Sequence, residues 1–302
     1  SVIGATLAIF VLIQFHNDPR ELFVPDSGYG ISQEQWEALG DRLGLNDPLW
    51  KQYVDWVGRT LRGDLGVSLA RDRAVTELLR GKIGATVQLA IGSWVFAIAL
   101  GIPMGVLAAV KRGSGWDYFG RGLAIVGQAA PPFVTALVAI WIFAVWLEWL
   151  PAGGRSPEFN WKEYILPCTA LGWGAAASLM RLTRSSMLEV LDSEYIRLAR
   201  AKGVNWNWVI YKHALRNALI VPVTSALLTF SGWLNGALVV EIVFSWPGIG
   251  YEALYRAVND NDFPLLLGTV FIFILIYLVF ATIADIAYTI IDPRVRLGDS
   301  SE

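Results

Sequence analysis

Residues 194–223, EYIRLARAKGVNWNWVIYKHALRNALIVPV, form a basic, amphipathic segment between two runs that are apolar enough to cross a bilayer. The first half predicts a helix, because its apolar residues recur at roughly helical spacing. Gly203 then marks a turn, since glycine adopts positive φ at no steric cost. A second short helix is expected after it, with apolar positions at Trp208, Val209, Tyr211, Leu215 and Leu219. A helix–glycine–helix hairpin that leaves a membrane is typical of a docking element.

The composition indicates a membrane protein. Of 302 residues, 55% are hydrophobic and 17% charged, and the mean hydropathy of +0.47 is too high for an ordinary soluble globule. The apolar residues are concentrated in charge-free runs, most of them near the ~20 residues that a helix needs to cross the hydrocarbon core. These runs are Ala85–Val110, Gly122–Leu147, Tyr164–Met180, Ala218–Val240 and Phe263–Ala284, with a shorter one at Val2–Phe15. We predict an all-α, polytopic fold with six transmembrane helices.

The short loops differ in their Lys and Arg content, which sets the orientation of a membrane protein. The connections after the second and fourth spans are basic, and so is the C-terminal tail. Their cations are Lys111, Arg112, Arg121, Arg181, Arg184, Arg197, Arg200, Lys202, Lys212, Arg216, Arg294 and Arg296. The alternate connections carry only Arg155, Lys162 and Arg256. We therefore expect a multi-pass membrane protein with the basic loops and both termini in the cytosol.

Four parts are expected along the chain. Residues 1–15 are the remainder of a trimmed first transmembrane helix, with a cleaved signal peptide as the alternative. Residues 16–82 form an external helical segment, in which Ser32 and Gln35 have the capping-box spacing, one helix ends near Gly44 and Pro48 starts the next. Residues 83–291 are the transmembrane core, including the cytosolic loop 189–216. Residues 292–302 are a cytosolic tail.

Sequence signatures of catalysis are absent. There is no phosphate-binding G-x-x-x-x-G-K-[ST] motif, nucleophile elbow or H-E-x-x-H. His16 and His213 are expected on opposite sides of the membrane and, with the lone Cys168, do not make a zinc site. We therefore expect no enzyme activity, no metal and no cofactor bound by this chain, and no nucleic-acid partner.

Polar residues within the spans are candidates for a translocation pathway, because they are costly in hydrocarbon and tend to face a cavity or another helix. Gln128 precedes Pro131 and Pro132, whose missing amide donors predict a kink. The pathway candidates are Gln88, Gln128, Pro131, Pro132, Thr224 and Asn235. The alternative is that such residues only cap their own backbone or allow close helix packing.

A second candidate site is the external loop that begins at Glu241. Trp246, Pro247, Gly248 and Gly250 predict a rigid turn, and Tyr251 opens a short helix after it. Two roles are possible for this loop: it could bind a soluble binding protein, or it could plug the outer end of the helix bundle.

These motifs together resemble one family. EYIRLARAKG and KHALRNALIVPV resemble the cytosolic "EAA" loop of the permease subunits of dipeptide/oligopeptide/nickel ABC importers. EIVFSWPGIG at 241–250 resembles the group's external loop, IDPRVRLG at 291–298 its ending, and residues 43–69 the external region of one of its two permeases. Gly203 and Leu215 fit the general loop pattern. Arg197, Leu198, His213 and Arg216 replace its Glu, first Ala, Ile and Pro, so no argument rests on the pattern's glutamate.

The resemblance implies a type I importer permease fold, a bacterial or archaeal cytoplasmic membrane and a set of partners. These are a homologous second permease, two cytosolic ABC ATPases that use ATP and Mg²⁺, an extracytoplasmic substrate-binding protein and membrane lipid. It implies that the loop docks in an ATPase groove, which Leu198, Val204 and Ile210 would fill. The implied coupling residues are Glu194, Arg197, Leu198, Ala199, Ala201, Lys202, Gly203, Val204, Ile210, His213, Leu215 and Arg216. A solvated loop held near anionic lipid is the alternative.

The expected function is ATP-driven import of di- or oligopeptides, or of a related solute such as a nickel chelate or an oligosaccharide. An ion-coupled secondary transporter is the alternative, but it would require intramembrane carboxylates and inverted repeats, and the apolar runs offer neither. An intramembrane enzyme would require paired catalytic groups at membrane depth, which the runs also lack.

Overall fold

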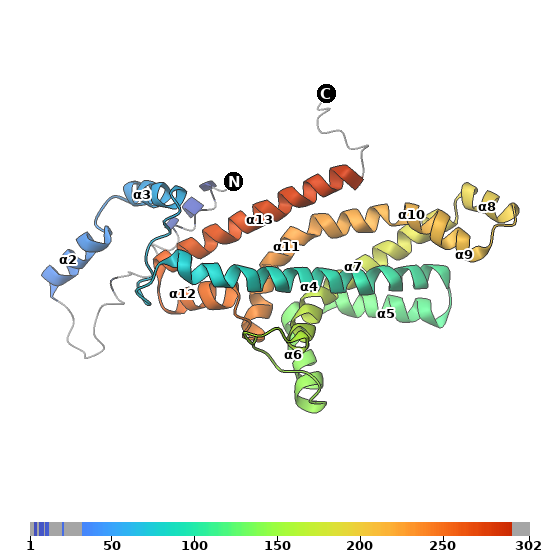
Figure 1. Ribbon diagram of the computed structural model, residues 1–302, viewed down its shortest axis with the longest axis horizontal. Coiled ribbons are helices and arrows are strands. Elements are labelled where there is room, and N and C mark those ends of the chain that lie inside the picture. The colour runs from blue at the N-terminus through green and yellow to red at the C-terminus, as the bar shows by residue number, and fades with distance from the viewer. Residues whose placement is uncertain (1–2, 5, 9, 12–19, 21–31, 292–302) are drawn as a thin grey trace, which may run out of the picture. The chain divides into compact units, whose positions relative to one another are not determined.

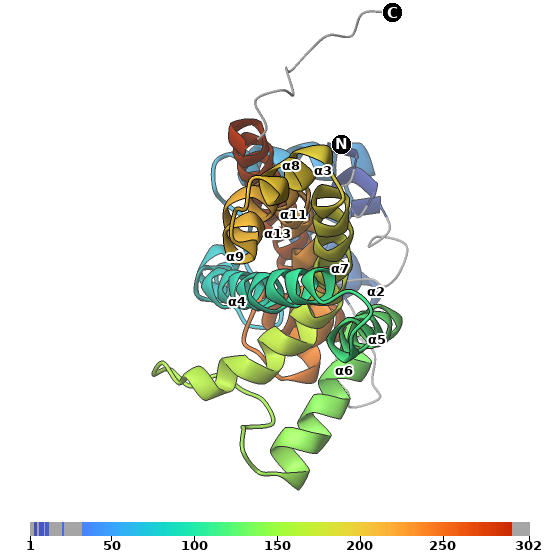
Figure 2. The ribbon, with the colours of Figure 1, turned by 90° about the vertical axis from the view of Figure 1, so that its right-hand side faces the viewer.

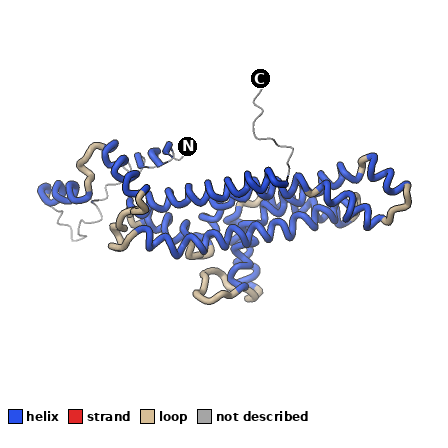
Figure 3. Tube along the Cα trace, turned by 45° about the horizontal axis from the view of Figure 1, so that its top comes forward, coloured by secondary structure: helices blue, strands red, loops and turns tan. Residues whose placement is uncertain are grey.

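The computed structural model describes residues 3–4, 6–8, 10–11, 20 and 32–291. Helices dominate this part of the chain, and it contains no strand, only an isolated bridge between Val67 and Ala74 (Figure 3). The all-α prediction is therefore confirmed. The chain divides into two compact units, residues 1–86 with 247–276, and residues 87–246 with 277–302. The first transmembrane helix expected at 1–15 lies largely outside the described residues, and the tail at 292–302 lies wholly outside them.

The segment expected outside the membrane contains two short helices, α2 (Gln33–Leu43) and α3 (Leu49–Leu61). Ser32 caps α2 as predicted, because its hydroxyl accepts from the Gln35 amide while the Gln35 side chain accepts from the Ser32 amide. Gly44 ends α2 at φ +70° and Pro48 precedes α3. The capping pattern therefore predicted both boundaries correctly.

The first unit has its own apolar core. The start of α4 (Val75–Val110) and of α13 (Phe263–Ile291) pack there with the π-helix η4 (Gly250–Tyr255) and with α12 (Arg256–Asn259). Its fully buried members include Val75, Leu79, Ile249 and Leu265. Asp262 begins α13 and accepts hydrogen bonds from the Ser68 hydroxyl and from the Leu69 and Leu265 amides. This buried carboxylate therefore caps α13 and fixes the loop that precedes α4.

Three described helices are long and apolar enough to cross a membrane: α4, α7 (Trp161–Leu191) and α13 up to Ala287. A bent pair counts as a fourth if it forms one span, and Ile220–Phe230 is a shorter apolar helix at the start of α11 (Ile220–Val243). The count of six spans stays a prediction. Because α4 begins at Val75, the boundary expected between 82 and 83 falls inside one continuous helix.

The second unit is organised by close packing of α4 on α7. A Cβ at Gly101 would lie 2.6 Å from the Ala176 carbonyl oxygen, and one at Gly105 the same distance from that of Met180. Glycine is therefore required at both positions, as at interfaces between membrane helices generally. The helix α5 (Gly115–Ala129) packs along α7 in the same unit (Figure 1).

The run Gly122–Leu147, expected as one span, is broken. The chain leaves α5 at Ala130 and continues in α6 (Pro132–Ala139) and the π-helix η2 (Ile140–Trp146), at an angle of 111° to α5 (Figure 2). Pro131 and Pro132 donate no amide hydrogen bond and so end the helix that precedes them. The predicted kink is confirmed, and a single bent span stays a prediction.

Candidate functional site

The quoted segment folds as a helix–glycine–helix hairpin at the end of α7 (Figure 1). Its elements are α8 (Glu194–Ala201), α9 (Trp206–Trp208), the π-helix η3 (Val209–Ala214) and α10 (Leu215–Ala218). Gly203 has φ +78°, and its amide donates to the Arg200 carbonyl at 2.9 Å. The predicted turn is therefore confirmed at Gly203, where only glycine adopts this backbone without strain.

The hairpin has an apolar core of its own, which also includes side chains from α4 and α7. The buried members of this core are Ala109, Met187, Ile196, Val209, Ile210, Ala214 and Ala218. Ile210 is only 5% exposed, and the half-buried Ala199, Val204 and Leu215 pack against the same core. The expectation that Ile210 fills a groove on another protein is therefore wrong, because this side chain is already buried within the chain.

The second half of the hairpin exposes two residues that we expected at apolar positions of an α-helix. Trp208 at the end of α9 and Tyr211 in η3 are 60% and 68% exposed. The buried residues of η3 are Val209, Ile210 and Ala214. Both aromatic rings therefore lie at the surface of the hairpin.

The hairpin exposes five large side chains, which we call the aromatic face. They are Tyr195, Leu198, Trp206, Trp208 and Tyr211, each at least 41% exposed. Cations lie over two of its rings, Arg200 5.1 Å from the centre of Trp206 and Lys212 5.1 Å from that of Trp208. The other charged candidates are also exposed: Glu194, Arg197, Lys202 and Arg216. Ala201 is exposed and His213 is half-buried.

Gln88 lies in a cluster of polar and aromatic side chains. Its amide oxygen accepts from Arg155 Nη2 at 3.0 Å and from the Tyr164 hydroxyl at 3.1 Å. The Tyr164 ring lies 4.9 Å from the ring of Trp246, centre to centre, and the Arg155 guanidinium lies 5.8 Å from the same ring. Gln88 therefore holds the loop after η2 and the start of α7 in place.

The structure brings Gln128, Pro131 and Pro132 together along one pocket of about 440 Å³. The pocket lies at the bend against α7, whose lining residues are mostly small: Ala170, Gly174, Ala175 and Ser178, with Leu171 beside them. Thr224 lies on α11, and its buried hydroxyl has no hydrogen-bond partner among the described residues. Asn235 is also on α11, but its side chain lies outside the described residues. A role in translocation stays a prediction for all of these residues.

The external loop is mostly buried. Trp246 and Ile249 are fully buried, and so are Gly248 and Gly250, whereas Pro247 and Tyr251 are half-buried. Such burial is what the plugging interpretation expects, since these residues contribute to the packing of their own chain. Docking of a binding protein on this loop stays a prediction.

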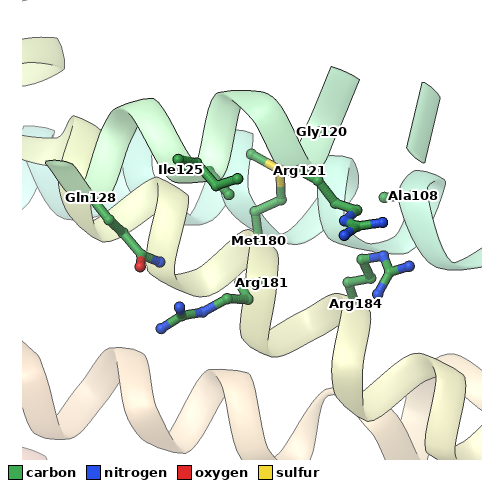
Figure 4. A pocket seen from close by; sticks show the side chains of 9 residues that line it. Ala108, Gly120, Arg121, Ile125, Gln128, Met180, Arg181 and Arg184 are labelled. Atoms are coloured by element: carbon green, nitrogen blue, oxygen red, sulfur yellow. The ribbon is translucent and has the colours of Figure 1, made fainter. Parts of the chain in front are cut away.

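Sequence reasoning missed a second pocket of about 440 Å³, which Gln128 also lines. Three arginines border it: Arg121 on α5, and Arg181 and Arg184 on α7 (Figure 4). Arg184 donates from Nε at 2.8 Å and from Nη2 at 3.0 Å to the buried carboxylate of Asp117. The sequence features that could have indicated this pocket are Asp117 at the start of α5 and the arginines close to an apolar run. We had used the arginines only to assign the topology.

Two buried carboxylates lie just outside the apolar runs. Asp117 lies in α5, before the run Gly122–Leu147, and Glu241 follows the run Ala218–Val240 near the end of α11. No group of three or more His, Cys, Asp and Glu side chains suited to a metal gathers within the described part of the chain.

Comparison with known proteins identifies similar chains. A family described as "Binding-protein-dependent transport system inner membrane component" matches residues 101–297. A putative peptide permease of Brucella suis is 37% identical over 305 residues, covering 98% of this chain and 95% of the relative. The dipeptide transport system permease protein DppB of Alkalihalophilus pseudofirmus is 37% identical with the same coverage. The glutathione transport system permease protein GsiC of Salmonella typhimurium is 39% identical, covering 96% and 94%.

Solved structures show the same fold. An inward-facing structure of the MetNI methionine ABC transporter matches with a TM-score of 0.60 and 18% identity, covering 71% of this chain and 96% of that chain. An amino acid ABC transporter matches with a TM-score of 0.52 and 16% identity, covering 70% and 94%. At these identities the likeness concerns the fold alone.

Proposed function

The chain belongs to the family of binding-protein-dependent transport system inner membrane components and is a permease subunit of an ABC importer; on that premise we propose that it carries short peptides across the cytoplasmic membrane. Relatives named for peptide, dipeptide and glutathione transport support this substrate class. A nickel chelate or an oligosaccharide is the alternative cargo.

The proposed assembly has five proteins. This chain pairs with a homologous second permease, so that solute passes along the interface between the two. Two cytosolic ATPases bind and hydrolyse ATP with Mg²⁺, and an extracytoplasmic binding protein delivers the solute. The distribution of Lys and Arg supports an orientation with the basic segments 111–121 and 181–216 in the cytosol.

We propose that the hairpin couples the permease to its ATPase, and one observation supports this role. The hairpin buries its own core and still exposes five large apolar side chains. Apolar groups of this size are costly in water, and aromatic residues are the commonest anchors of protein interfaces. We therefore assign the docking of the ATPase to the aromatic face, with Leu198, Trp208 and Tyr211 as its most exposed anchors. The adjacent cations Arg197, Lys202 and Arg216 suit an acidic rim on the partner.

The first test replaces an anchor of the aromatic face. We expect Trp208→Ala to weaken ATPase binding by roughly 30-fold or more, since truncation of an interface anchor costs about 2 kcal/mol or more. The measurement is the amount of ATPase that co-purifies with the tagged permease, together with ATP-dependent uptake of labelled dialanine in proteoliposomes.

Trp149→Ala is the matched control, because Trp149 is equally exposed at 64% but lies outside the hairpin. It should retain both the ATPase and uptake. If Trp208→Ala also retains both, the aromatic face is not the docking surface. If wild-type uptake persists when the ATPases are omitted and follows an ion gradient instead, the chain works as a secondary transporter and the proposal is wrong.

A further inference from the structure

The pocket bordered by three arginines carries an excess of positive charge. Asp117 neutralises Arg184 by a bidentate ion pair. Arg121 lies four residues after Asp117 on α5 and interacts with the same carboxylate, but neither Arg121 nor Arg181 makes an ion pair within 4 Å among the described residues. Both side chains are exposed, so their donors are available to an anionic ligand.

The shape and lining of this pocket suit a small ligand. Its volume of about 440 Å³ lies in the range of ordinary ligand sites. Met180, Ala124 and Ile125 provide an apolar wall, whereas Gln128 offers an amide at one end (Figure 4). The polar groups that could bind a ligand are therefore the guanidinium groups of Arg121 and Arg181 and the amide of Gln128.

The pocket is the second of two that Gln128 lines. The first lies at the bend, between Pro131 and the small residues of α7, and the second lies further along the same two helices toward the hairpin. A solute leaving the first pocket along α7 would pass Ser178 and Gln128 and then meet Arg181. Two pockets in series fit a route through the protein better than a site for a lipid headgroup, which needs no second pocket at the bend.

We propose that Arg121 and Arg181 form a site for the terminal carboxylate of the transported solute. Guanidinium groups bind carboxylates by paired, charge-assisted hydrogen bonds. Every unmodified peptide carries this carboxylate whatever its side chains are. In the proposed assembly a separate binding protein selects the solute, so the permease needs to bind only the terminal carboxylate that all peptides share. This inference rests on the proposed function, since it assumes a peptide as cargo.

The test compares labelled dialanine with labelled dialanine amide, using the complete transporter in proteoliposomes. Wild type should carry the free acid faster than the amide. We expect Arg121→Gln and Arg181→Gln each to slow the acid roughly tenfold, the usual effect of losing one charged hydrogen bond, and to slow the amide little. All reactions contain the same binding protein, so a change in the acid-to-amide ratio belongs to the permease.

Arg112→Gln is the matched control, because Arg112 is an exposed cation of the neighbouring loop that does not line the pocket. It should leave the ratio unchanged. A second readout needs neither transport nor the binding protein: the acid should raise the melting temperature of the purified complex more than the amide does, and both pocket variants should abolish this difference.

Three results would overturn the carboxylate site. In the first, both variants keep the wild-type difference between acid and amide. In the second, they lose bound phosphatidylglycerol in native mass spectrometry and keep that difference, which assigns the arginines to lipid phosphate. In the third, they lose the second permease on purification, which assigns them to a subunit contact. If the wild type transports no dipeptide but its melting temperature still responds to the acid through Arg181, the substrate class is wrong and the carboxylate site stands.

Discussion

Asp117 is a buried carboxylate with one arginine as its main partner. Its side chain is 3% exposed and accepts from Arg184 at 2.8 and 3.0 Å and from the Gly113 amide at 3.0 Å. Removal of one member of a buried pair leaves the other charge uncompensated. We therefore expect Asp117→Ala to lower the free energy of unfolding by about 3 kcal/mol, measured as a fall in the melting temperature of the purified complex.

An exposed ion pair nearby provides the control for Asp117. Asp192 lies 3.8 Å from Arg112, and the two side chains are 72% and 65% exposed. Because exposed pairs contribute little, Asp192→Ala should change the free energy of unfolding by about 1 kcal/mol or less. Equal losses in the two variants would show that burial of Asp117 is not what makes its pair important.

Gly203 supports a second prediction at this scale. Proline has φ near −65° and no amide hydrogen, so Gly203→Pro removes both the positive φ and the bond to Arg200. The variant should still insert in the membrane, but ATP-dependent uptake should be lost, because α8 would no longer turn back onto the core of the hairpin. Uptake in proteoliposomes and the amount of protein in the membrane fraction measure the two effects.

Gly63 offers an almost identical control outside the hairpin. It has φ +82°, and its amide donates at 2.9 Å to the carbonyl of Thr60, three residues earlier, as Gly203 does to Arg200. Gly63→Pro therefore imposes the same backbone change in the external segment. It should lower stability and leave uptake per folded molecule unchanged. Loss of uptake in both variants would assign the effect to misfolding instead.

At the scale of elements, the contact of α4 with α7 depends on the absence of side chains. A Cβ at Gly101 would lie 2.6 Å from a backbone oxygen and 2.9 Å from the Leu179 Cβ, so one of the two helices must shift. We expect Gly101→Ala to destabilise the protein by about 1–3 kcal/mol, the usual cost of overpacking. Thermal unfolding of the purified protein measures this effect.

Gly84 lies on the same helix and gives the opposite expectation. A Cβ there would have no neighbour within 4 Å. Gly84→Ala should therefore stabilise α4 by up to about 1 kcal/mol through helix propensity alone. If both alanine variants change the melting temperature in the same direction, close packing is not the reason for glycine at position 101.

The broken span shows which features of elements can be read from a sequence. Pro131 and Pro132 predicted a kink, because each lacks an amide donor. The 111° angle depends on how α6 packs against α7, and no local pattern encodes that contact. Capping residues acted locally and were reliable: Ser32, Gly44 and Gly203 all stand at the predicted boundaries.

For the molecule as a whole, apolar runs and long motifs predicted the class, the all-α fold and the family correctly. Prediction failed at single side chains of the hairpin. Ile210 is buried, although the resemblance implied that it fills a groove of a partner, and Trp208 and Tyr211 are exposed, although helical spacing placed them at apolar positions. The arginine-lined pocket was missed because it combines residues from α5 and α7 that are about sixty positions apart, which spacing along one helix does not reveal.

The shared core of the hairpin has a mechanical consequence. Ala109 of α4 and Met187 of α7 are packed into the same cluster as Ile196 and Val209. A partner protein that moves the exposed side chains of the hairpin would therefore move the hairpin as a rigid unit, and little of the displacement would be lost to bending. Because α4 and α7 share this core, both helices would move together in each cycle of nucleotide hydrolysis.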